Sequence, residues 1–132
     1  MENKFKLLTQ SEIECMIKPL KIKQLHLYQQ AFVHKSVLKY SDDHGITESY
    51  ERLECLGDRV LDLVTIDYLY HEYPNDDEGK LSRKKVRIVQ GSTLTKLAKK
   101  CGIQGKILMT EHTNNLGGQQ NKNLLEDVFE AL

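Results

Sequence analysis

Apolar residues recur at intervals of three and four along most of the chain, which is the spacing of amphipathic helices. Between these stretches lie short polar segments rich in Gly, Asn and Asp, which favour turns. The pattern therefore predicts an all-α fold, a helical bundle. The expected helices cover residues 9–19, 23–33, 51–70, 81–100 and 123–132, and the expected loops cover 41–48, 75–79 and 110–120.

Polar residues at the edges of these stretches are expected to cap the helices. Thr9 or Ser11 can cap the first helix, and Asn121 or Asn123 can cap the last. The segment 81–100 is expected to break near Gly91–Ser92, with the serine capping its second half. The apolar faces of 23–33 and 81–100 supply candidate core residues: Leu25, Leu27, Tyr28, Ala31, Phe32, Leu81, Val86, Val89, Leu94, Leu97 and Ala98.

Residues 51–70 carry a narrow acidic stripe. At 3.6 residues per turn the stripe falls within an arc of roughly 80°, and Cys55, Leu61 and Ile66 border it. Partly buried carboxylates that repel one another require a cation or a proton. From this helix alone two interpretations stay open, an acidic face in water or a divalent metal site. The stripe consists of Glu51, Glu54, Asp58 and Asp62, and the opposite side of Leu53, Leu56, Val60, Leu63 and Val64.

The composition limits how the chain can meet nucleic acid. A length of 132 residues suits one domain, and 19 basic and 19 acidic residues give a formal charge of zero. Any binding to nucleic acid must therefore come from a local patch. The densest basic run is either a solvated helix face or a phosphate-binding patch, and it consists of Lys80, Arg83, Lys84, Lys85 and Arg87.

The cysteines and the apolar runs indicate an intracellular protein, cytoplasmic or nuclear. Cys15, Cys55 and Cys101 lie far apart, are odd in number and form no Cys-x-x-Cys pair, which argues against disulfides and a structural zinc. No run approaches the ~18 apolar residues of a membrane span. The N-terminal residues lack the apolar core of a signal peptide.

A second acidic pair lies in the last predicted helix, where Asp127 and Glu130 are three residues apart. Alone, this helix reads as an ordinary amphipathic element. If it faces the helix of Glu54 and Asp58, four carboxylates converge into an all-oxygen site. Such a site suits magnesium or manganese rather than zinc, and it suits hydrolysis of phosphodiester bonds.

Four segments resemble elements of the ribonuclease III family. Residues 51–58, Glu-Arg-Leu-Glu-Cys-Leu-Gly-Asp, match the family signature Glu-Arg-Leu-Glu-Phe-Leu-Gly-Asp at seven of eight positions. Residues 31–36 resemble the family's Thr-His-Lys/Arg-Ser element, and residues 78–89 resemble Glu-Gly-x-Leu-Ser-x-x-Arg. Residues 125–132 match Leu-x-Asp-x-x-Glu-Ala-Leu. The resemblance covers roughly residues 25–132.

The resemblance implies a metal-dependent endonuclease that cuts double-stranded RNA and leaves 5′-phosphate and 3′-hydroxyl ends. It implies Mg²⁺ as cofactor, with Mn²⁺ able to substitute, and a symmetric homodimer. Glu51 and Glu78 match accessory acids. His34 is either an RNA contact or, as we expect, a structural residue at a helix start. The implied catalytic metal ligands are Glu54, Asp58, Asp127 and Glu130, and the expected interface residues are Cys55, Ile66 and Leu69.

Three features depart from the family pattern. Cys55 replaces an aromatic residue that inserts into the partner subunit, so a weak dimer is expected. Arg59 replaces a small residue and can pair with a ligand carboxylate in the metal-free protein. The third departure concerns the extent of the domain. The expected domain spans 1–132, with an N-terminal extension over 1–24, a last helix cut short at Leu132 and no double-stranded-RNA-binding domain.

A non-catalytic scaffold of the same fold is the alternative function, and the four retained acids favour the enzyme.

Overall fold

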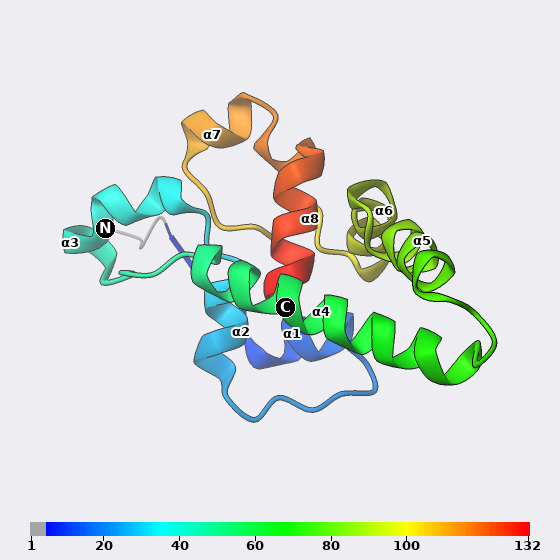
Figure 1. The fold of residues 1–132 in the computed structure, drawn as a ribbon. Coiled ribbons are helices and arrows are strands. Elements are labelled where there is room, and N and C mark those ends of the chain that lie inside the picture. Colours follow the sequence, from blue (N-terminus) through cyan, green and yellow to red (C-terminus); the bar gives the residue numbers. More distant parts are fainter. Residues whose placement is uncertain (1–4) are drawn as a thin grey trace.

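The computed structural model describes residues 5–132 and confirms an all-α fold (Figure 1). Residues 1–4 of the expected N-terminal extension lie outside the described part of the chain. Within it there is no strand, only an isolated bridge between Val33 and Leu108. The helices are α1 (Gln10–Met16), α2 (Leu25–Ala31), η1 (Lys35–Tyr40), α3 (Ser41–His44), α4 (Glu51–Glu72), α5 (Glu78–Val89), α6 (Gly91–Cys101), α7 (Glu111–Asn115), η2 (Gly118–Gln120) and α8 (Lys122–Ala131), of which η1 and η2 are short 3₁₀ helices.

The caps of the first and last helices are as predicted. The Thr9 hydroxyl accepts a hydrogen bond from the Glu12 backbone N–H, and Glu12 returns a capping-box contact to Thr9. The Asn121 side chain accepts from the Leu124 N–H at the start of α8. The predicted break in 81–100 is confirmed, but Ser92 is not the cap. Gln90 separates α5 from α6, because its extended backbone ends one helix and begins the next.

Two segments expected as loops contain short helices. Within 41–48, α3 forms a single helical turn. This turn ends at Gly45, whose φ of 71° lies in the left-handed region. In 110–120, the Thr110 hydroxyl accepts from the Thr113 N–H and caps α7. Asp, Asn, Ser and Thr favour both turns and helix starts, so their presence alone did not separate the two.

Helix α8 lies at the centre of the bundle and packs against α4 and α6 (Figure 1). Leu125 and Val128 of α8 are fully buried. The core also contains the predicted residues Ala31, Phe32, Leu94 and Ala98, together with Ile13 and Ile103. The other candidates on α5 and α6 were partly wrong: Val86 is 56% exposed and Leu97 is 38% exposed, since no other element of the described chain covers their side of those helices.

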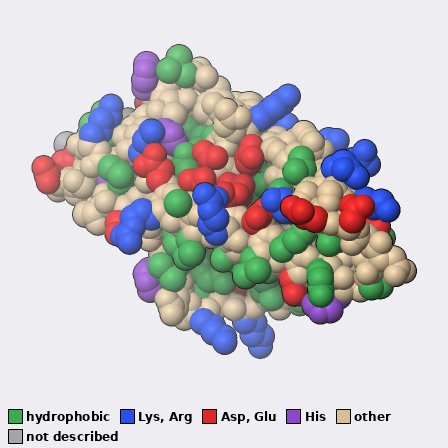
Figure 2. All heavy atoms as spheres, in the orientation of Figure 1, with side chains coloured by type: hydrophobic (Ala, Val, Ile, Leu, Met, Phe, Trp, Pro, Cys, Tyr) green, Lys and Arg blue, Asp and Glu red, His purple; other side chains and the backbone are tan. Residues whose placement is uncertain are grey.

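One face of α4 is apolar and open to solvent. Leu56, Val60, Leu63 and Val64, which lie opposite the acidic stripe, are 51–65% exposed. Figure 2 shows hydrophobic side chains gathered along the lower side of this helix. Leu69, by contrast, is only 2% exposed and belongs to the core of the single chain, so it offers little surface to a partner. Among residues 5–132, no helix is both long and apolar enough to cross a membrane.

Candidate metal centre

Three carboxylates meet where α4 crosses α8. Glu54, in the first turn of α4, and Asp127 and Glu130 of α8 each offer one oxygen, and these oxygens lie within 4.8 Å of one another. All three side chains are half-buried. The spacing of three on α8 places Asp127 and Glu130 on one side of that helix, as the sequence predicts. Acidic side chains cluster over this crossing in Figure 2.

The close crossing depends on Gly57. A Cβ added to this residue would lie 1.7 Å from the backbone carbonyl oxygen of Glu130. Only a glycine leaves room for the two helices to approach so closely at this point. Gly57 lies one turn after Glu54, so the close approach brings the carboxylates of α4 and α8 into reach of one another.

Asp58, the fourth predicted ligand, does not join the group of three. Its carboxylate accepts a hydrogen bond from the guanidinium of Arg59, with which it forms an ion pair. The predicted pairing of Arg59 with a carboxylate is therefore present, and the partner is Asp58. The remaining three predicted acids are those that the fold brings together.

Glu126 is an acid near this centre that the sequence reasoning missed. It precedes Glu130 by four residues, so the two side chains lie about one turn apart on the same side of α8. Its carboxylate lies against Gly91 at the start of α6, where an added Cβ would be 2.3 Å from Glu126 Oε2. The four-residue spacing to Glu130 was the signal that could have found it.

Burial and mutual repulsion make these carboxyl groups hard to ionise. Burial is the largest cause that raises the pKa of Glu130 to about 7, and the charges of Asp58 and Glu126 raise it further. Burial likewise raises the pKa of Glu54, with Asp127 as the next cause. The pKa of Asp127 is also raised by burial, although the hydrogen bond from Tyr50 opposes this shift. A bound cation would relieve this repulsion.

The donor set fits a hard divalent cation. All three converging atoms are carboxylate oxygens, and within the described chain no His or Cys joins them. Oxygen ligands of this kind favour magnesium, manganese or calcium, whereas zinc sites are built mainly from Cys and His.

Tyr50 connects the three carboxylates to the core of the protein. The sequence reasoning did not select this residue. Its hydroxyl donates to Asp127 Oδ2 at 3.4 Å, and its side chain is buried. Burial raises the pKa of Tyr50, as does the charge of Asp127, so the phenol keeps its proton. Tyr50 immediately precedes α4, and its position beside Glu51 was the only sequence signal for its role.

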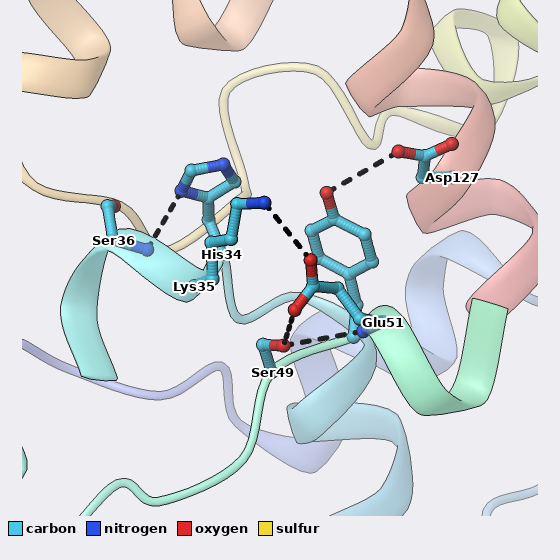
Figure 3. Close-up of polar contacts among 7 residues, drawn as sticks. His34, Lys35, Ser36, Ser49, Glu51 and Asp127 are labelled. Carbon is cyan, nitrogen blue, oxygen red and sulfur yellow. Dashed lines mark hydrogen bonds and ion pairs between the residues drawn. The ribbon is translucent and has the colours of Figure 1, made fainter. Parts of the chain in front are cut away.

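Glu51 lies at the edge of the centre and is held by two neighbours. Its carboxylate accepts from Lys35 Nζ and from Ser49 Oγ, each at 3.2 Å (Figure 3). His34 has the structural role expected of it: its Nδ1 accepts from the Ser36 N–H and caps η1. Burial lowers the pKa of His34, which favours the neutral ring that this cap requires.

The predicted basic run lies on α5, away from the three carboxylates (Figure 1). A shallow cleft of about 180 Å³ is lined by Lys80, Arg83, Lys84 and Arg87. Lys84 also pairs with Asp76 at 2.5 Å, and Lys85 pairs with Asp62 of α4 at 2.7 Å. Two of the five cations therefore already have acidic partners, which leaves the other three as the stronger candidates for phosphate contacts.

Three further predicted site residues, Glu78, Cys55 and Ile66, do not belong to the group of three carboxylates. Glu78 begins α5, and the length of α4 separates it from Glu54 by roughly 25 Å. Within one chain it therefore does not join the carboxylates. Cys55 is exposed on α4, and Ile66 is half-buried on the same helix.

Comparison with known proteins gives consistent matches. A family model described as "Ribonuclease-III-like" matches residues 24–132. The chain is 42% identical to ribonuclease 3 of Lactobacillus acidophilus over 105 residues, which cover 80% of this chain and 46% of that protein. The chain spans about half the length of the curated relatives it matches.

Two solved structures of the nuclease domain of ribonuclease III from Campylobacter jejuni share the fold. One superposes with a TM-score of 0.79 at 33% identity, covering 99% of this chain and 80% of that one. The other gives a TM-score of 0.75 at 36% identity, covering 84% of this chain and 73% of that one, and it is described as showing structural flexibility in a region involved in dimer formation.

Proposed function

Because this chain belongs to the ribonuclease III family, we propose that it is a metal-dependent endoribonuclease domain that hydrolyses phosphodiester bonds of double-stranded RNA. The products would carry 5′-phosphate and 3′-hydroxyl ends. The observation that carries the proposal is the convergence of Glu54, Asp127 and Glu130 at the crossing of α4 and α8. The family implies a divalent metal ion, and the all-oxygen donor set supports Mg²⁺, with Mn²⁺ as a substitute.

The metal ligands in this proposal are Glu54, Asp127 and Glu130, with Asp58 as the fourth. A bound Mg²⁺ or Mn²⁺ would supply positive charge for the attacked phosphate and the leaving 3′ oxygen, and would make water a better nucleophile. The protein contributes the placement of the carboxylates. The hydrogen bond from Tyr50 orients Asp127, and the contacts of Glu51 with Lys35 and Ser49 fix an accessory acid at the rim.

RNA binding in this proposal uses the cleft on α5. Lys80, Arg83, Lys84 and Arg87 line it and offer positive charge to backbone phosphates, and Lys85 lies on the same helix. A duplex bound in this way is recognised through its shape, its phosphates and its 2′-hydroxyls, so we expect little sequence specificity.

We further propose that two copies associate through the open apolar face of α4. Leu56, Val60, Leu63 and Val64 form this face, and Cys55 and Ile66 lie on the same helix. A contiguous exposed apolar surface of this kind is typical of a protein interface. In such a dimer, Glu78 can serve as an accessory acid only at a centre that a second copy brings near it.

The test is incubation of the purified chain with long duplex RNA and millimolar Mg²⁺. We expect cleavage of duplex RNA, no cleavage in EDTA and little cleavage of single-stranded RNA. Asp127→Asn keeps the shape of the side chain but removes its charge, so it should abolish cleavage. Asp67→Asn is the matched control, because Asp67 lies exposed on α4 and pairs with His71.

Two results would reject the proposal. Full activity of Asp127→Asn would show that the three carboxylates do not hold a catalytic metal. A folded, dimeric wild type that binds duplex RNA but never cuts it would favour the non-catalytic scaffold instead.

A further inference from the structure

Arg59 is the feature of this centre that the proposed reaction leaves without a role. Its guanidinium donates to Asp58 Oδ2 in an ion pair between neighbouring residues of α4. The Arg59 side chain is 75% exposed, so the core does not hold it in place. Its one polar partner in the described structure is the carboxylate that fails to join the other three.

The charge of Arg59 also reaches the carboxylates that do converge. Burial raises the pKa of Glu54, and so do the charges of three neighbouring acids, Asp127, Asp58 and Glu51. The charge of Arg59 lowers that pKa. Arg59 therefore provides positive charge close to the place where a metal would sit. Two cations at such short range repel each other, and they also compete for the same carboxylate.

We propose that Arg59 is a positioning residue that competes with the metal for Asp58. In the metal-free protein it holds the Asp58 carboxylate outside the group formed by Glu54, Asp127 and Glu130. Metal binding then requires Asp58 to leave Arg59 and turn toward the other three acids. This inference rests on the proposed metal centre and adds a specific consequence, which is that Arg59 weakens the affinity for metal.

Removal of the guanidinium should therefore tighten metal binding. An exposed ion pair contributes little, because water screens it and both side chains lose freedom in forming it. Release of Asp58 alone would thus lower the Kd for Mn²⁺ by about two- to fivefold. Asp58 must be present for this gain, since the gain comes from freeing its carboxylate.

The experiment is calorimetric titration of the full chain with Mn²⁺, which measures metal binding without any RNA. The variants are Arg59→Ser and, as a matched control, Arg52→Ser. Arg52 lies two turns earlier on α4, is 88% exposed and pairs with Glu48, so its removal changes the net charge equally. Asp58 lies six residues after Arg52, which is about 9 Å along the helix axis. Charges about this far apart are largely screened at physiological ionic strength, so removal of Arg52 should have little effect on Asp58. Thermal unfolding in EDTA checks that both variants fold.

We expect Arg59→Ser to bind Mn²⁺ about two- to fivefold more tightly than both the wild type and Arg52→Ser. In an Asp58→Asn background the same replacement should change the Kd no more than Arg52→Ser does. This double-mutant comparison separates competition for Asp58 from general repulsion. Equal shifts for Arg59→Ser and Arg52→Ser, or a gain that persists in full without Asp58, would overturn the inference.

The failure of this inference can be told from a failure of the metal centre. If Asp127→Asn abolishes Mn²⁺ binding while Arg59→Ser leaves the Kd unchanged, the centre stands and the role of Arg59 is wrong. If neither the wild type nor Arg59→Ser binds Mn²⁺ in a manner that depends on Asp127, both are wrong.

Discussion

Gly57 of α4 lies against the backbone carbonyl of Glu130 on α8, and a Cβ at Gly57 would be 1.7 Å from that oxygen. The close approach links helix packing to chemistry, because Glu54 lies one turn before Gly57 and Glu130 carries one of the converging carboxylates. A backbone carbonyl cannot move aside as the end of a flexible side chain can. Any side chain at Gly57 must therefore shift α4 relative to α8.

We expect Gly57→Ala to destabilise the fold and to abolish metal binding together. Overpacking of this kind typically costs about 1–3 kcal/mol, and separation of α4 from α8 would pull Glu54 away from Asp127. Thermal unfolding in EDTA and Mn²⁺ titration measure the two effects. The control is Gly79→Ala in the first turn of α5, where the nearest atom belongs to the flexible Arg83 side chain at 3.2 Å. A Gly57→Ala protein with wild-type stability and metal affinity would contradict the packing argument.

The metal-free protein should lose stability as the pH rises from 5 to 8. The pKa of Glu130 is raised from 4.5 to about 7, so between these values the folded state holds a proton that the unfolded state has released. By linkage, the free energy of unfolding then falls as the pH increases through this window. After allowance for the partial exposure of Glu130, its share is roughly 1 kcal/mol.

Comparison with Glu130→Gln isolates this contribution. The pKa of His34 is lowered by burial, which gives the opposite pH dependence, and both proteins share that effect. Unfolding in EDTA between pH 5 and 8 should therefore show a steeper loss of stability in the wild type than in Glu130→Gln. Parallel curves would mean that Glu130 titrates normally in the folded protein.

Manganese should raise the melting temperature at neutral pH. A cation that binds only the folded state stabilises it by about 2.7 kcal/mol at a hundredfold excess over its Kd. Because the metal must displace the proton that Glu130 retains up to a pKa of about 7, the effect should shrink at pH 5. Glu54→Gln, which removes one converging carboxylate, should show much less stabilisation at either pH. An equal rise in both proteins would indicate binding elsewhere.

Much of this centre could be predicted from sequence, because spacing along a helix determines which side chains share a face. Asp127 and Glu130 are three residues apart and share one side of α8, as predicted, and the structure shows that they meet Glu54 of α4. The orientation of Asp58 could not be predicted in the same way, since it depends on which rotamer lets it reach Arg59. Gly57 stood in the recognised signature, but its contact with Glu130 joins residues far apart in the sequence.

The open face of α4 shows a second limit of sequence reasoning. Periodicity finds an apolar stripe but not what covers it. Leu56 and Leu69 both lie on this helix, yet the first is exposed and the second is buried by the rest of the chain. Only the positions of the neighbouring helices decide between an internal core and an external interface.

Tyr50→Phe should weaken Mn²⁺ binding with little loss of stability. The change removes the hydroxyl that donates to Asp127 at 3.4 Å but keeps the buried ring. Loss of a residue that orients a metal ligand typically costs 10–100-fold in affinity, and for so long a hydrogen bond we expect roughly tenfold or less. Titration with Mn²⁺ measures the change. Tyr28→Phe also removes a tyrosine hydroxyl, from a residue of α2 that packs against the core, and serves as the control. Equal affinities for the two variants would rule out an orienting role for Tyr50.

The chain should form a homodimer in which Leu63 is a central contact. Leu63 is 65% exposed on the apolar face of α4, and burial of a leucine contributes about 1.5–3 kcal/mol. In a two-fold interface each residue contributes twice. Leu63→Glu should therefore abolish the dimer, whereas Leu116→Glu, at a residue that is 75% exposed outside α4, should not. Sedimentation across a concentration series measures both, and unchanged association of Leu63→Glu would exclude this face.

Cys55 is expected to make this dimer weak, with a Kd near micromolar. Cysteine buries less apolar area than the aromatic residue usual at this position, and truncation of a buried aromatic costs about 3–5 kcal/mol when the cavity remains open. Cys55 is exposed beside Leu56 in the single chain, so Cys55→Phe should tighten the dimer if the partner subunit keeps an open cavity there, and should clash if that cavity has closed. The same sedimentation series tests this. A wild-type dimer that persists at the lowest measurable concentration, and that Cys55→Phe does not strengthen, would show that the remaining residues of α4 suffice for tight association.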